Sequence, residues 1–357
     1  MLDGVRVIEI EGIGPGPFAA MMLADLGAEV ITVHRPGGAA QDHPSARLLD
    51  RGKKSILLDL KCPADCRTAR DLIAISDALV EGFRPGVMER LGLGPDICMA
   101  DNPALVYGRM TGWGQDGPKS GMAGHDLNYI ATSGALWYAS EPGRPPLTPP
   151  SLLGDVGGGA LYLVAGILAG LIKSRSSGTG TVVDAAIVDG SAHMMALLMS
   201  LAPRMERGQS LLDGPHWSRT YACADGGFMS VQCLERKFYD TFLGLMGLSQ
   251  DPDFNDQHDP RQWPLQTARL AGLFASASTD HWATLLEGTD ACAAPVLSPE
   301  AAARDPHMMA RGTWQQQDGV LQPAPAPRFS DSKPSSAQLP DRGQHDAEIR
   351  AILARTG

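Results

Sequence analysis

Three features are scarce or missing in this 357-residue sequence: clusters of positive charge, paired cysteines and a long unbroken hydrophobic run. The chain has 30 Lys and Arg against 40 Asp and Glu, a formal net charge of −10. Without a basic cluster it lacks the electrostatic surface that nucleic-acid binding requires, so no nucleic-acid partner is expected. An anionic ligand would have to be held by individual arginines and lysines.

The six cysteines are scattered, and Cys62 and Cys66 form the one close pair. No second pair or His-rich stretch follows them, so a zinc site is not expected. Scattered thiols and the lack of a signal peptide favour a reducing cytoplasm. The most apolar run, residues 156–172, is glycine-rich and short for a membrane span, which predicts a buried helix and no membrane partner.

The first two hundred residues alternate between short apolar runs and helical patterns. Apolar runs at 5–10, 30–33, 55–60, 78–81, 105–110 and 181–186 predict strands, with helices at 18–26, 66–75, after residue 155 and at 190–200. Such alternation is typical of an open, mostly parallel sheet that binds ligands at the carboxyl ends of its strands. We therefore predict an α/β fold whose large domain contains residues 1–200.

The pattern changes in the second half of the chain. Residues 201–219 carry Gly, Pro and Arg with little periodicity and predict a linker. Residues 220–305 begin with a hairpin around Asp225-Gly-Gly227 and continue with two or three helices, which predicts a small α+β domain. Residues 306–357 then return to the large domain, which is thereby split. Residues 316–328 are predicted to be extended, and residues 347–354 to form a last helix.

The turn after the first strand, Glu11-Gly-Ile-Gly-Pro-Gly-Pro17, resembles a dinucleotide-binding loop in part. Pro15 and Pro17 lack the N–H donors that would hold a pyrophosphate. The second strand also ends in His34-Arg35-Pro36, where a ribose would need an acidic residue, so nicotinamide binding is not expected. Several cations fall near predicted carboxyl ends of strands and indicate a phosphate-rich ligand: Arg35, Lys53, Lys54, Arg84 and Arg90.

His125 and Asp155 are the candidate acid/base residues. Each lies where a glycine-rich turn enters a predicted helix, in Gly124-His-Asp-Leu-Asn-Tyr129 and Gly154-Asp-Val-Gly-Gly-Gly159. Glycines allow a ligand to approach the backbone, and the first N–H groups of a helix attract negative charge. This arrangement suits chemistry through a carbanion or enolate. From spacing alone, helix caps or hydrogen-bonded core groups are the more common roles of such residues.

These motifs, taken in order, resemble those of the class III CoA-transferase family, and within it the racemases that act on 2-methylacyl-CoA thioesters. The resemblance covers nearly the whole chain. Its further markers are Arg51-Gly-Lys-Lys-Ser55, Arg84-Pro-Gly-Val87, Leu91-Gly-Leu-Gly-Pro95, Gly112-Trp-Gly-Gln115, Thr289-Asp-Ala-Cys292 with Pro295-Val-Leu297, and Asp305-Pro-His307.

The resemblance implies an isomerase built as an interlocked homodimer of two-domain subunits, with no metal and no redox cofactor. It would interconvert (2R)- and (2S)-2-methylacyl-CoA by removing and returning the α-proton through an enolate. His125 and Asp155 match the acid/base residues of the racemases. Glu235 matches an acidic residue that the small domain contributes to the partner's site. Arg35, Arg84 and Arg90 match positions that hold the nucleotide and phosphates of CoA.

Further site residues are expected beside these. Ile13, Lys53, Lys54 and Tyr129 are candidates for CoA binding, and the backbone N–H groups at the helix start near Asp126 are candidate oxyanion donors. If His125 is the neutral base, Asp155 must be protonated, so burial is expected to raise the pKa of Asp155.

Some residues depart from the family pattern. His34 replaces an acidic residue, Ser151 replaces an Asn, and Pro215-His216-Trp217 replaces an aromatic pair. The residues around Glu235 also differ from those that the family has there. We interpret the His34 change as bearing on the adenosine end of CoA and the other departures as lying near the acyl pocket, so no particular acyl chain is predicted. Two alternatives stay open: a CoA-transferase in which Asp155 is the nucleophile, or a catalytically silent acyl-CoA-binding protein. A transferase has no need of a second base at His125.

Overall fold

The computed structural model describes residues 1–37, 44–139, 143–201, 207–208, 210–317, 319–331 and 338–356. The chain divides into two compact units. The sheet unit contains Met1–Ala135, Pro149–Met194 and His307–Gly357, and the small unit contains Leu136–Thr148 and Met195–Pro306. The sequence placed residues 136–148 in the large domain and its boundary at residue 200. The structure instead divides the chain inside one continuous helix, α7 (Ile187–Leu201), which periodicity cannot reveal.

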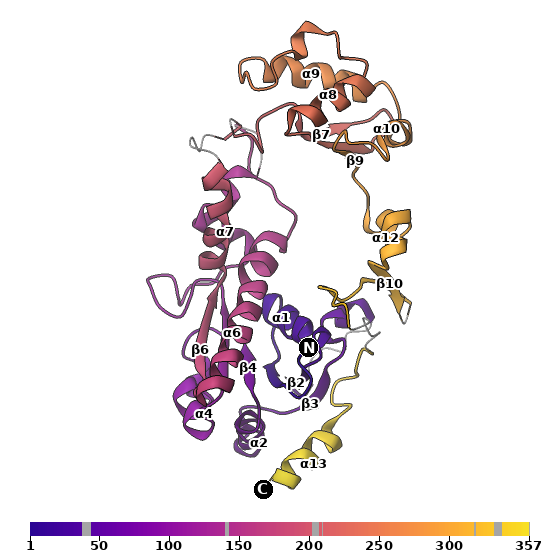
Figure 1. The fold of residues 1–357 in the computed structure, drawn as a ribbon. Coiled ribbons are helices and arrows are strands. Elements are labelled where there is room, and N and C mark those ends of the chain that lie inside the picture. The colour runs from indigo at the N-terminus through magenta and orange to yellow at the C-terminus, as the bar shows by residue number, and fades with distance from the viewer. Residues whose placement is uncertain are drawn as a thin grey trace. The chain divides into compact units, whose positions relative to one another are not determined.

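The described part of the sheet unit is built on six parallel strands (Figure 1). They are β1 (Arg6–Ile10), β2 (Glu29–His34), β3 (Lys54–Leu57), β4 (Ala78–Glu81), β5 (Val106–Thr111) and β6 (Thr181–Ala186). Their order is β3-β2-β1-β4-β5-β6, and every neighbouring pair is parallel. The predicted α/β fold with a parallel sheet is therefore confirmed. The strand order reverses between β1 and β4, which is where sheets of this kind bind ligands.

Helices cover both faces of this sheet, so its central strands are buried on both sides and are mainly apolar, with the buried charged residues Glu9, Glu81 and Arg109 among them. Helices α1 (Pro15–Asp25) and α6 (Leu161–Ser177) supply one buried cluster, which includes Leu23 and Ile167. Helices α2 (Pro63–Ala74), α4 (Pro95–Asp101) and α13 (Asp346–Thr356) supply the other, which includes Leu72 and Ile349.

The stretch Leu152–Ser177 is, among the described residues, the one helix long and apolar enough to cross a membrane. It begins as a π-helical segment, η3 (Leu152–Ala160), and continues as α6. A Cβ atom at Gly166 would lie 2.4 Å from Val183, and one at Gly170 would lie 2.6 Å from Val106. The two glycines thus let α6 pack closely against β5 and β6. The predicted burial of this helix holds in part, because Ile167 and Leu171 are buried whereas Leu161 and Ile172 are exposed.

The small unit has its own three-stranded antiparallel sheet and core. Its strands are β7 (Ser218–Ala222), β8 (Phe228–Gln232) and β9 (Ala293–Pro295), and its main helices are α8 (Arg236–Leu245), α9 (Trp263–Phe274) and α10 (Thr279–Leu286). The hairpin predicted around Asp225 is β7–β8.

Two departures from the family pattern, His216 and Trp217, belong to the core of the small unit, where both are fully buried. His216 Nε2 lies 2.8 Å from the hydroxyl oxygen of Tyr239, and Trp217 Nε1 donates to the carbonyl oxygen of Gln257 at 3.1 Å. Both side chains thus pack inside the small unit, and their place near an acyl pocket stays a prediction. An aromatic replacement in a sequence does not show whether the side chain faces a ligand or a core.

The return segment contains a structure that the sequence did not predict. After α11 (Pro299–Ala302) and α12 (Pro306–Arg311), the strands β10 (Trp314–Gln317) and β11 (Val320–Pro323) form an antiparallel hairpin where an extended chain was predicted. Gln322 in β11 is fully buried, and its side-chain oxygen accepts a hydrogen bond from Arg51 at 3.2 Å. Such a distant polar partner leaves no local signal in the sequence.

Candidate active site

A cavity of about 350 Å³ lies at the carboxyl ends of β1, β4 and β5, where the strand order reverses. Residues 12–17 after β1, 82–85 after β4 and 110–113 at the end of β5 form much of its wall. The helical segments that follow β5 add His125, Asp126, Tyr129 and Asp155. The cavity therefore brings together the two acid/base residues that the sequence singled out, and all of its lining belongs to the sheet unit.

His125 immediately precedes α5 (Asp126–Ser133) and has an extended backbone, with φ −137°. Its N–H donates to Asn128 Oδ1 at 3.1 Å, which fixes the start of the helix and leaves the imidazole exposed beside the cavity. In the part of the chain that the structure describes, the N–H groups of Asp126 and Leu127 have no backbone acceptor. They are the first donors of α5, as an oxyanion site at this helix start would require.

The Asp126 carboxylate connects the two helical segments that carry the candidate acid/base residues His125 and Asp155. Its Oδ1 accepts the N–H of Asp155 at 2.9 Å, and its Oδ2 accepts the N–H of Ser151 at 3.2 Å. A Cβ atom at Gly154 would lie only 2.3 Å from Asp126 Oδ1, so this contact requires a glycine. Asp126 thus caps η3 while its own backbone begins α5, and it fixes His125 relative to Asp155.

The pKa of Asp155 is raised above its ordinary value of 3.8. Burial is the largest cause, and the negative charge of Asp126 adds to it, while a hydrogen bond from Ser151 and the charge of His125 act to lower this pKa. The shift has the direction expected for a residue that delivers a proton. The effect of His125 on this carboxyl agrees with their common place in the cavity wall.

Tyr129 is held rigidly in the cavity wall. Its hydroxyl donates to the carbonyl oxygen of Gly124, and its ring meets Trp113 edge-on with ring centres 4.8 Å apart. A Cβ atom at Gly112 would lie 2.0 Å from the Tyr129 ring, and one at Gly124 would lie 2.7 Å from it. Burial and the charge of Asp155 raise the pKa of Tyr129, so its hydroxyl stays protonated. The glycines of these two motifs therefore make room for an aromatic ring.

Of the residues predicted to bind CoA, some line the cavity and others do not. Ile13, Arg84 and Tyr129 line the cavity, and Ile13 is 83% exposed. Arg35 and Arg90 are exposed but are not among the lining residues.

The two predicted lysines do not fit the reasoning that selected them. Lys54 opens β3 and Lys53 precedes it, so both lie at the amino end of that strand rather than its carboxyl end. Lys53 Nζ donates to Glu9 Oε2 at 2.7 Å and to the carbonyl oxygen of Pro17 at 3.1 Å, and both charged side chains are 1% exposed. Lys54 pairs with Glu29 and Glu348, each at 2.7 Å. These ammonium groups already have carboxylate partners within the protein.

Sequence reasoning missed a buried ion pair behind the cavity. Glu81, the last residue of β4, is 1% exposed; its Oε1 accepts from Arg109 Nε at 3.0 Å and its Oε2 accepts the N–H of Phe83 at 2.7 Å. Arg109 also bonds Glu89 at 2.8 Å. The bond to Phe83 holds the backbone directly before Arg84. The available signal was a Glu at the end of one apolar strand and an Arg within the next strand along the chain.

Glu235 belongs to the small unit and is exposed at the start of α8. Its carbonyl oxygen accepts the N–H groups of Phe238 and Tyr239, each at 3.0 Å, and its side chain carries charge close to Cys292. Its catalytic role stays a prediction. Across the described ranges, no three His, Cys, Asp or Glu side chains are grouped so as to hold a metal ion.

Known proteins resemble this chain along its whole length. Residues 2–346 match the model of CoA-transferase family III. The chain is 40% identical to an alpha-methylacyl-CoA racemase of Mus musculus and 39% identical to that of Homo sapiens, each over 98% of this chain and 92% of the relative. A probable fatty acyl-CoA transferase of Mycobacterium tuberculosis is 32% identical over 82% of each chain. The crystal structure of a CaiB/BaiF family protein from Brucella suis matches with a TM-score of 0.83, at 27% identity over 99% of both chains.

Proposed function

The chain belongs to CoA-transferase family III, and we propose that it is a racemase that interconverts the (2R) and (2S) epimers of 2-methylacyl-CoA thioesters. One observation carries this proposal: His125 and Asp155 line a single cavity, and the pKa of Asp155 is raised. The racemase names of relatives at 39–40% identity agree with it. Epimerisation at C2 needs one group to take a proton and another to return one to the opposite face.

The proposed reaction begins with neutral His125 and protonated Asp155. The imidazole takes the α-proton, and the electron pair of the C2–H bond forms the C1–C2 double bond of the enolate. Asp155 then donates its proton to the other face of C2, and the enolate electrons return to form the new C–H bond. The opposite epimer uses the same groups in reversed roles. Each positioned proton transfer contributes typically about 10²–10⁴-fold to the rate.

The enolate oxygen also needs stabilisation, because the α-proton of a thioester is only weakly acidic. We assign this role to the N–H groups of Asp126 and Leu127 at the start of α5, which have no backbone acceptor among the described residues. Donors fixed before the reaction favour the charge that develops in the transition state, and removing one such donor typically costs about 10²–10³-fold in kcat.

Incubation of the protein with (2S)-2-methylacyl-CoA in deuterated water tests the proposal. A racemase would produce the (2R) epimer carrying deuterium at C2 without any added acid acceptor. A mixture of epimers with no acceptor present would exclude pure CoA transfer. Recovery of the undeuterated (2S) thioester after long incubation would refute racemisation of this substrate.

CoA transfer is the second candidate, because several relatives at 27–32% identity are named CoA-transferases. In that reaction the Asp155 carboxylate attacks the thioester carbonyl, a mixed anhydride forms, and the C–S bond breaks to release CoA thiolate. An acceptor carboxylate and CoA then complete the exchange. Product formation that depends strictly on an added carboxylic acid, with no deuterium at C2, would support this alternative. A silent acyl-CoA-binding protein would bind the thioester and show neither reaction.

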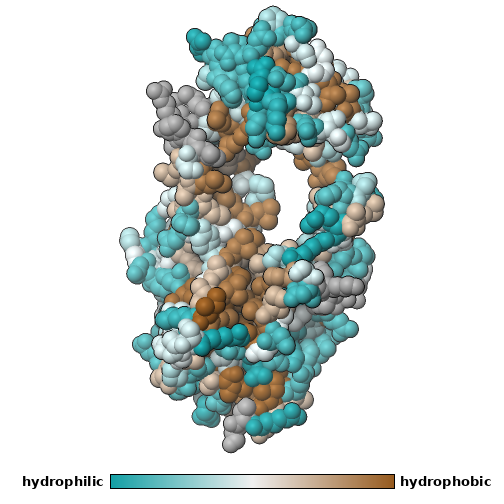
Figure 2. Space-filling view, in the orientation of Figure 1, coloured by the Kyte–Doolittle hydropathy of each residue, from teal (hydrophilic) through white to brown (hydrophobic). Residues whose placement is uncertain are grey.

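We further propose that the protein is an interlocked homodimer and that Glu235 acts in the partner's active site. The family resemblance supports this, as do the exposure of Glu235 and the apolar side chains exposed on the sheet unit, including Leu161 and Ile172 at 42% and 72%. Figure 2 shows apolar atoms gathered over the region of α6.

Co-expression of His125→Ala and Glu235→Ala chains tests this sharing. If each site takes His125 from one subunit and Glu235 from the other, a mixed dimer has one intact site and regains activity. Each variant expressed alone is the matched control and should be inactive. A silent mixed dimer would show that all roles lie in one chain, and full activity of the Glu235→Ala homodimer would remove Glu235 from the mechanism.

No metal or redox cofactor has a part in the proposed reaction, because His125 and Asp155 perform both proton transfers. We also propose a cytoplasmic location. All six cysteines are free thiols in the structure, as expected in a reducing compartment.

A further inference from the structure

Residues 338–346 run along β3, which is an edge strand of the parallel sheet. The N–H of Gly343 donates to Ser55 Oγ at 2.8 Å, and the N–H of His345 donates to the carbonyl oxygen of Ser55 at 3.0 Å. The N–H of Ser55 in turn donates to His345 Nδ1 at 3.1 Å. This C-terminal segment is therefore bonded directly to the edge of the sheet.

Arg342, at the centre of this segment, holds a residue at the other end of the sequence. Its two terminal nitrogens form a forked ion pair with the Glu11 carboxylate, and Nη2 lies 2.9 Å from Oε2. Burial acts to raise the pKa of Glu11, but hydrogen bonds from Arg342 and from the N–H of Arg35 outweigh it, and the pKa is lowered. Glu11 is thus held in its charged form.

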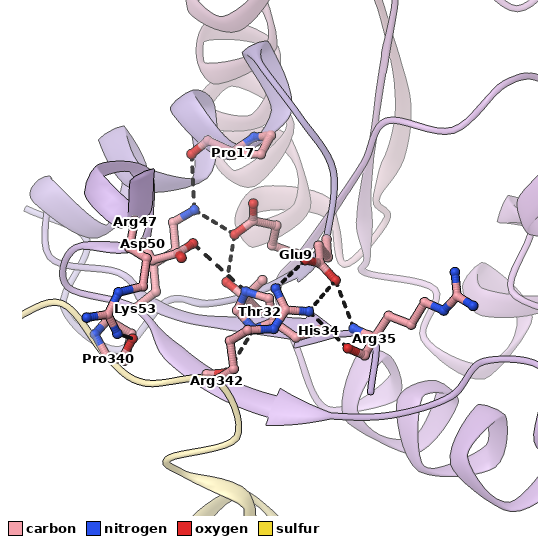
Figure 3. A network of polar contacts seen from close by, with 12 residues as sticks. Glu9, Pro17, Thr32, His34, Arg35, Arg47, Asp50, Lys53, Pro340 and Arg342 are labelled. Atoms are coloured by element: carbon pink, nitrogen blue, oxygen red, sulfur yellow. Dashed lines mark hydrogen bonds and ion pairs between the residues drawn. The ribbon is translucent and has the colours of Figure 1, made fainter. Parts of the chain in front are cut away.

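Glu11 and Arg342 also bond the backbone of Arg35. Glu11 Oε2 accepts the N–H of Arg35 at 2.8 Å, and Arg342 Nη2 donates to the carbonyl oxygen of Arg35 at 2.9 Å. Both polar backbone groups of Arg35 are therefore fixed by side chains. Its guanidinium group points away from this cluster, as Figure 3 shows, so the contacts that fix the backbone leave the cationic end outside the cluster.

Glu11 also connects this cluster to the cavity. Its N–H donates to the carbonyl oxygen of Val33 at 3.0 Å, which extends the pairing of β1 with β2 by one residue. Residues 12–17, which follow directly, line the cavity. A displacement of Glu11 would therefore move both the start of this loop and the backbone from which Arg35 extends.

We infer that Arg342 is a positioning residue for the nucleotide end of coenzyme A: acting through Glu11, it fixes Arg35 where that side chain can bind a phosphate. The inference rests on the proposed CoA thioester substrate. An arginine is required because its planar fork bonds both carboxylate oxygens and a carbonyl oxygen at once, which a lysine ammonium cannot reproduce in the same geometry. Because the phosphates are remote from C2, Arg342 affects binding rather than the chemical step.

Calorimetric titration with free coenzyme A tests the inference without requiring turnover. Arg342→Gln is expected to raise the dissociation constant about tenfold, as is typical when one charge-assisted contact is lost. Arg342→Lys should restore little of this affinity. Arg35→Ala should weaken binding to a similar extent, and the Arg35→Ala/Arg342→Gln double variant should bind no more weakly than Arg35→Ala, because both changes remove one contact.

Arg47→Ala is the matched control. Arg47 bonds Asp341 and the carbonyl oxygen of Pro340, the latter at 3.2 Å, so it ties the same segment to the sheet unit without touching Glu11 or Arg35. Its loss should change the dissociation constant by less than about twofold, as expected for a surface ion pair. A second readout is turnover of a 2-methylacyl-pantetheine thioester, which lacks the nucleotide. Its KM should be the same for the unmodified protein and for Arg342→Gln.

Several results would overturn the inference. They are unchanged CoA affinity in Arg342→Gln, additive effects of Arg35→Ala and Arg342→Gln, or equal weakening by Arg47→Ala. If Arg342→Gln does not fold, Glu11→Gln takes its place. This change removes the ion pair but keeps an oxygen that can accept the N–H of Arg35. Normal CoA affinity of Glu11→Gln would count equally against the inference. Failure of the unmodified protein to bind CoA would overturn the proposed function together with the inference, whereas normal CoA binding by the variants would overturn the inference alone.

Discussion

Replacement of Lys53 by Met is expected to destabilise the protein strongly, although the sequence suggested that Lys53 is a surface ligand for phosphate. Lys53 and Glu9 form an internal ion pair, with Nζ and Oε2 2.7 Å apart and both side chains 1% exposed. Methionine is nearly as long as lysine, so the change removes the charge without opening a large cavity. It leaves Glu9 as a buried carboxylate without its cation.

The size of the effect follows from the contacts that remain. After the change, Glu9 Oε2 keeps only the hydrogen bond from Thr32 Oγ1 at 2.7 Å, and the carbonyl oxygen of Pro17 loses the Lys53 donor. Breaking a buried ion pair by removing one partner typically costs about 3–5 kcal/mol. Replacing both members of such a pair with uncharged groups often changes the free energy of unfolding little. The double variant Glu9→Gln/Lys53→Met should therefore recover most of the lost stability.

Lys54→Met is the matched control on the next residue. Lys54 bonds Glu29 and Glu348, but its side chain is 29% exposed, and surface pairs of this kind contribute about 0–1 kcal/mol. Urea denaturation followed by circular dichroism measures all three variants. Equal losses for Lys53→Met and Lys54→Met, or a double variant no more stable than Lys53→Met, would refute the assignment of Lys53 to an internal ion pair.

Three further changes have expected outcomes. Gly112→Ala should cost about 1–3 kcal/mol and lower kcat, because its Cβ would lie 2.0 Å from the Tyr129 ring; unchanged thermal unfolding would contradict this. Asp155→Asn should be inactive yet more stable at neutral pH. The folded protein raises the pKa of Asp155, so ionisation costs stability as the pH rises through the folded pKa, and the advantage of Asn should fade as the pH falls towards 3.8. Ser151→Gly should gain about 1 kcal/mol in thermal unfolding, because Ser151 has φ 61°. It should also raise the pKa of Asp155 further, seen as a shift of the pH–rate profile, because its hydroxyl no longer bonds that carboxyl.

Much of the sheet was predictable because its strands are short apolar runs with helical patterns between them. Residues 78–81 and 181–186 were predicted as strands and form β4 and β6 with those bounds. The same spacing placed a ligand site at the carboxyl ends, and the cavity lies there. His125 was predicted at the entry to a helix and is the residue directly before α5. These features depend on residues that are close together in the sequence, so the sequence alone predicts them.

The features that were missed depend on partners far away in the chain. Glu9 and Lys53 are 44 residues apart, and Glu11 and Arg342 are 331 residues apart, so no local pattern connects either pair. Residue type alone could not separate an internal lysine from a phosphate ligand. The π-helical segment η3 was equally hidden, and its contact with Asp126 joins residues that are 28 positions apart at Gly154.

The central claim, that two opposed bases act in one cavity, is tested most directly by deuterium exchange in His125→Ala and Asp155→Asn, with each pure epimer supplied separately. Both variants should lose epimerisation, because each turnover needs one group on each face of C2. Residual exchange at C2 should survive with one epimer in His125→Ala and with the other epimer in Asp155→Asn. Near-normal epimerisation by either variant, or exchange of the same epimer in both, would contradict the two-base mechanism.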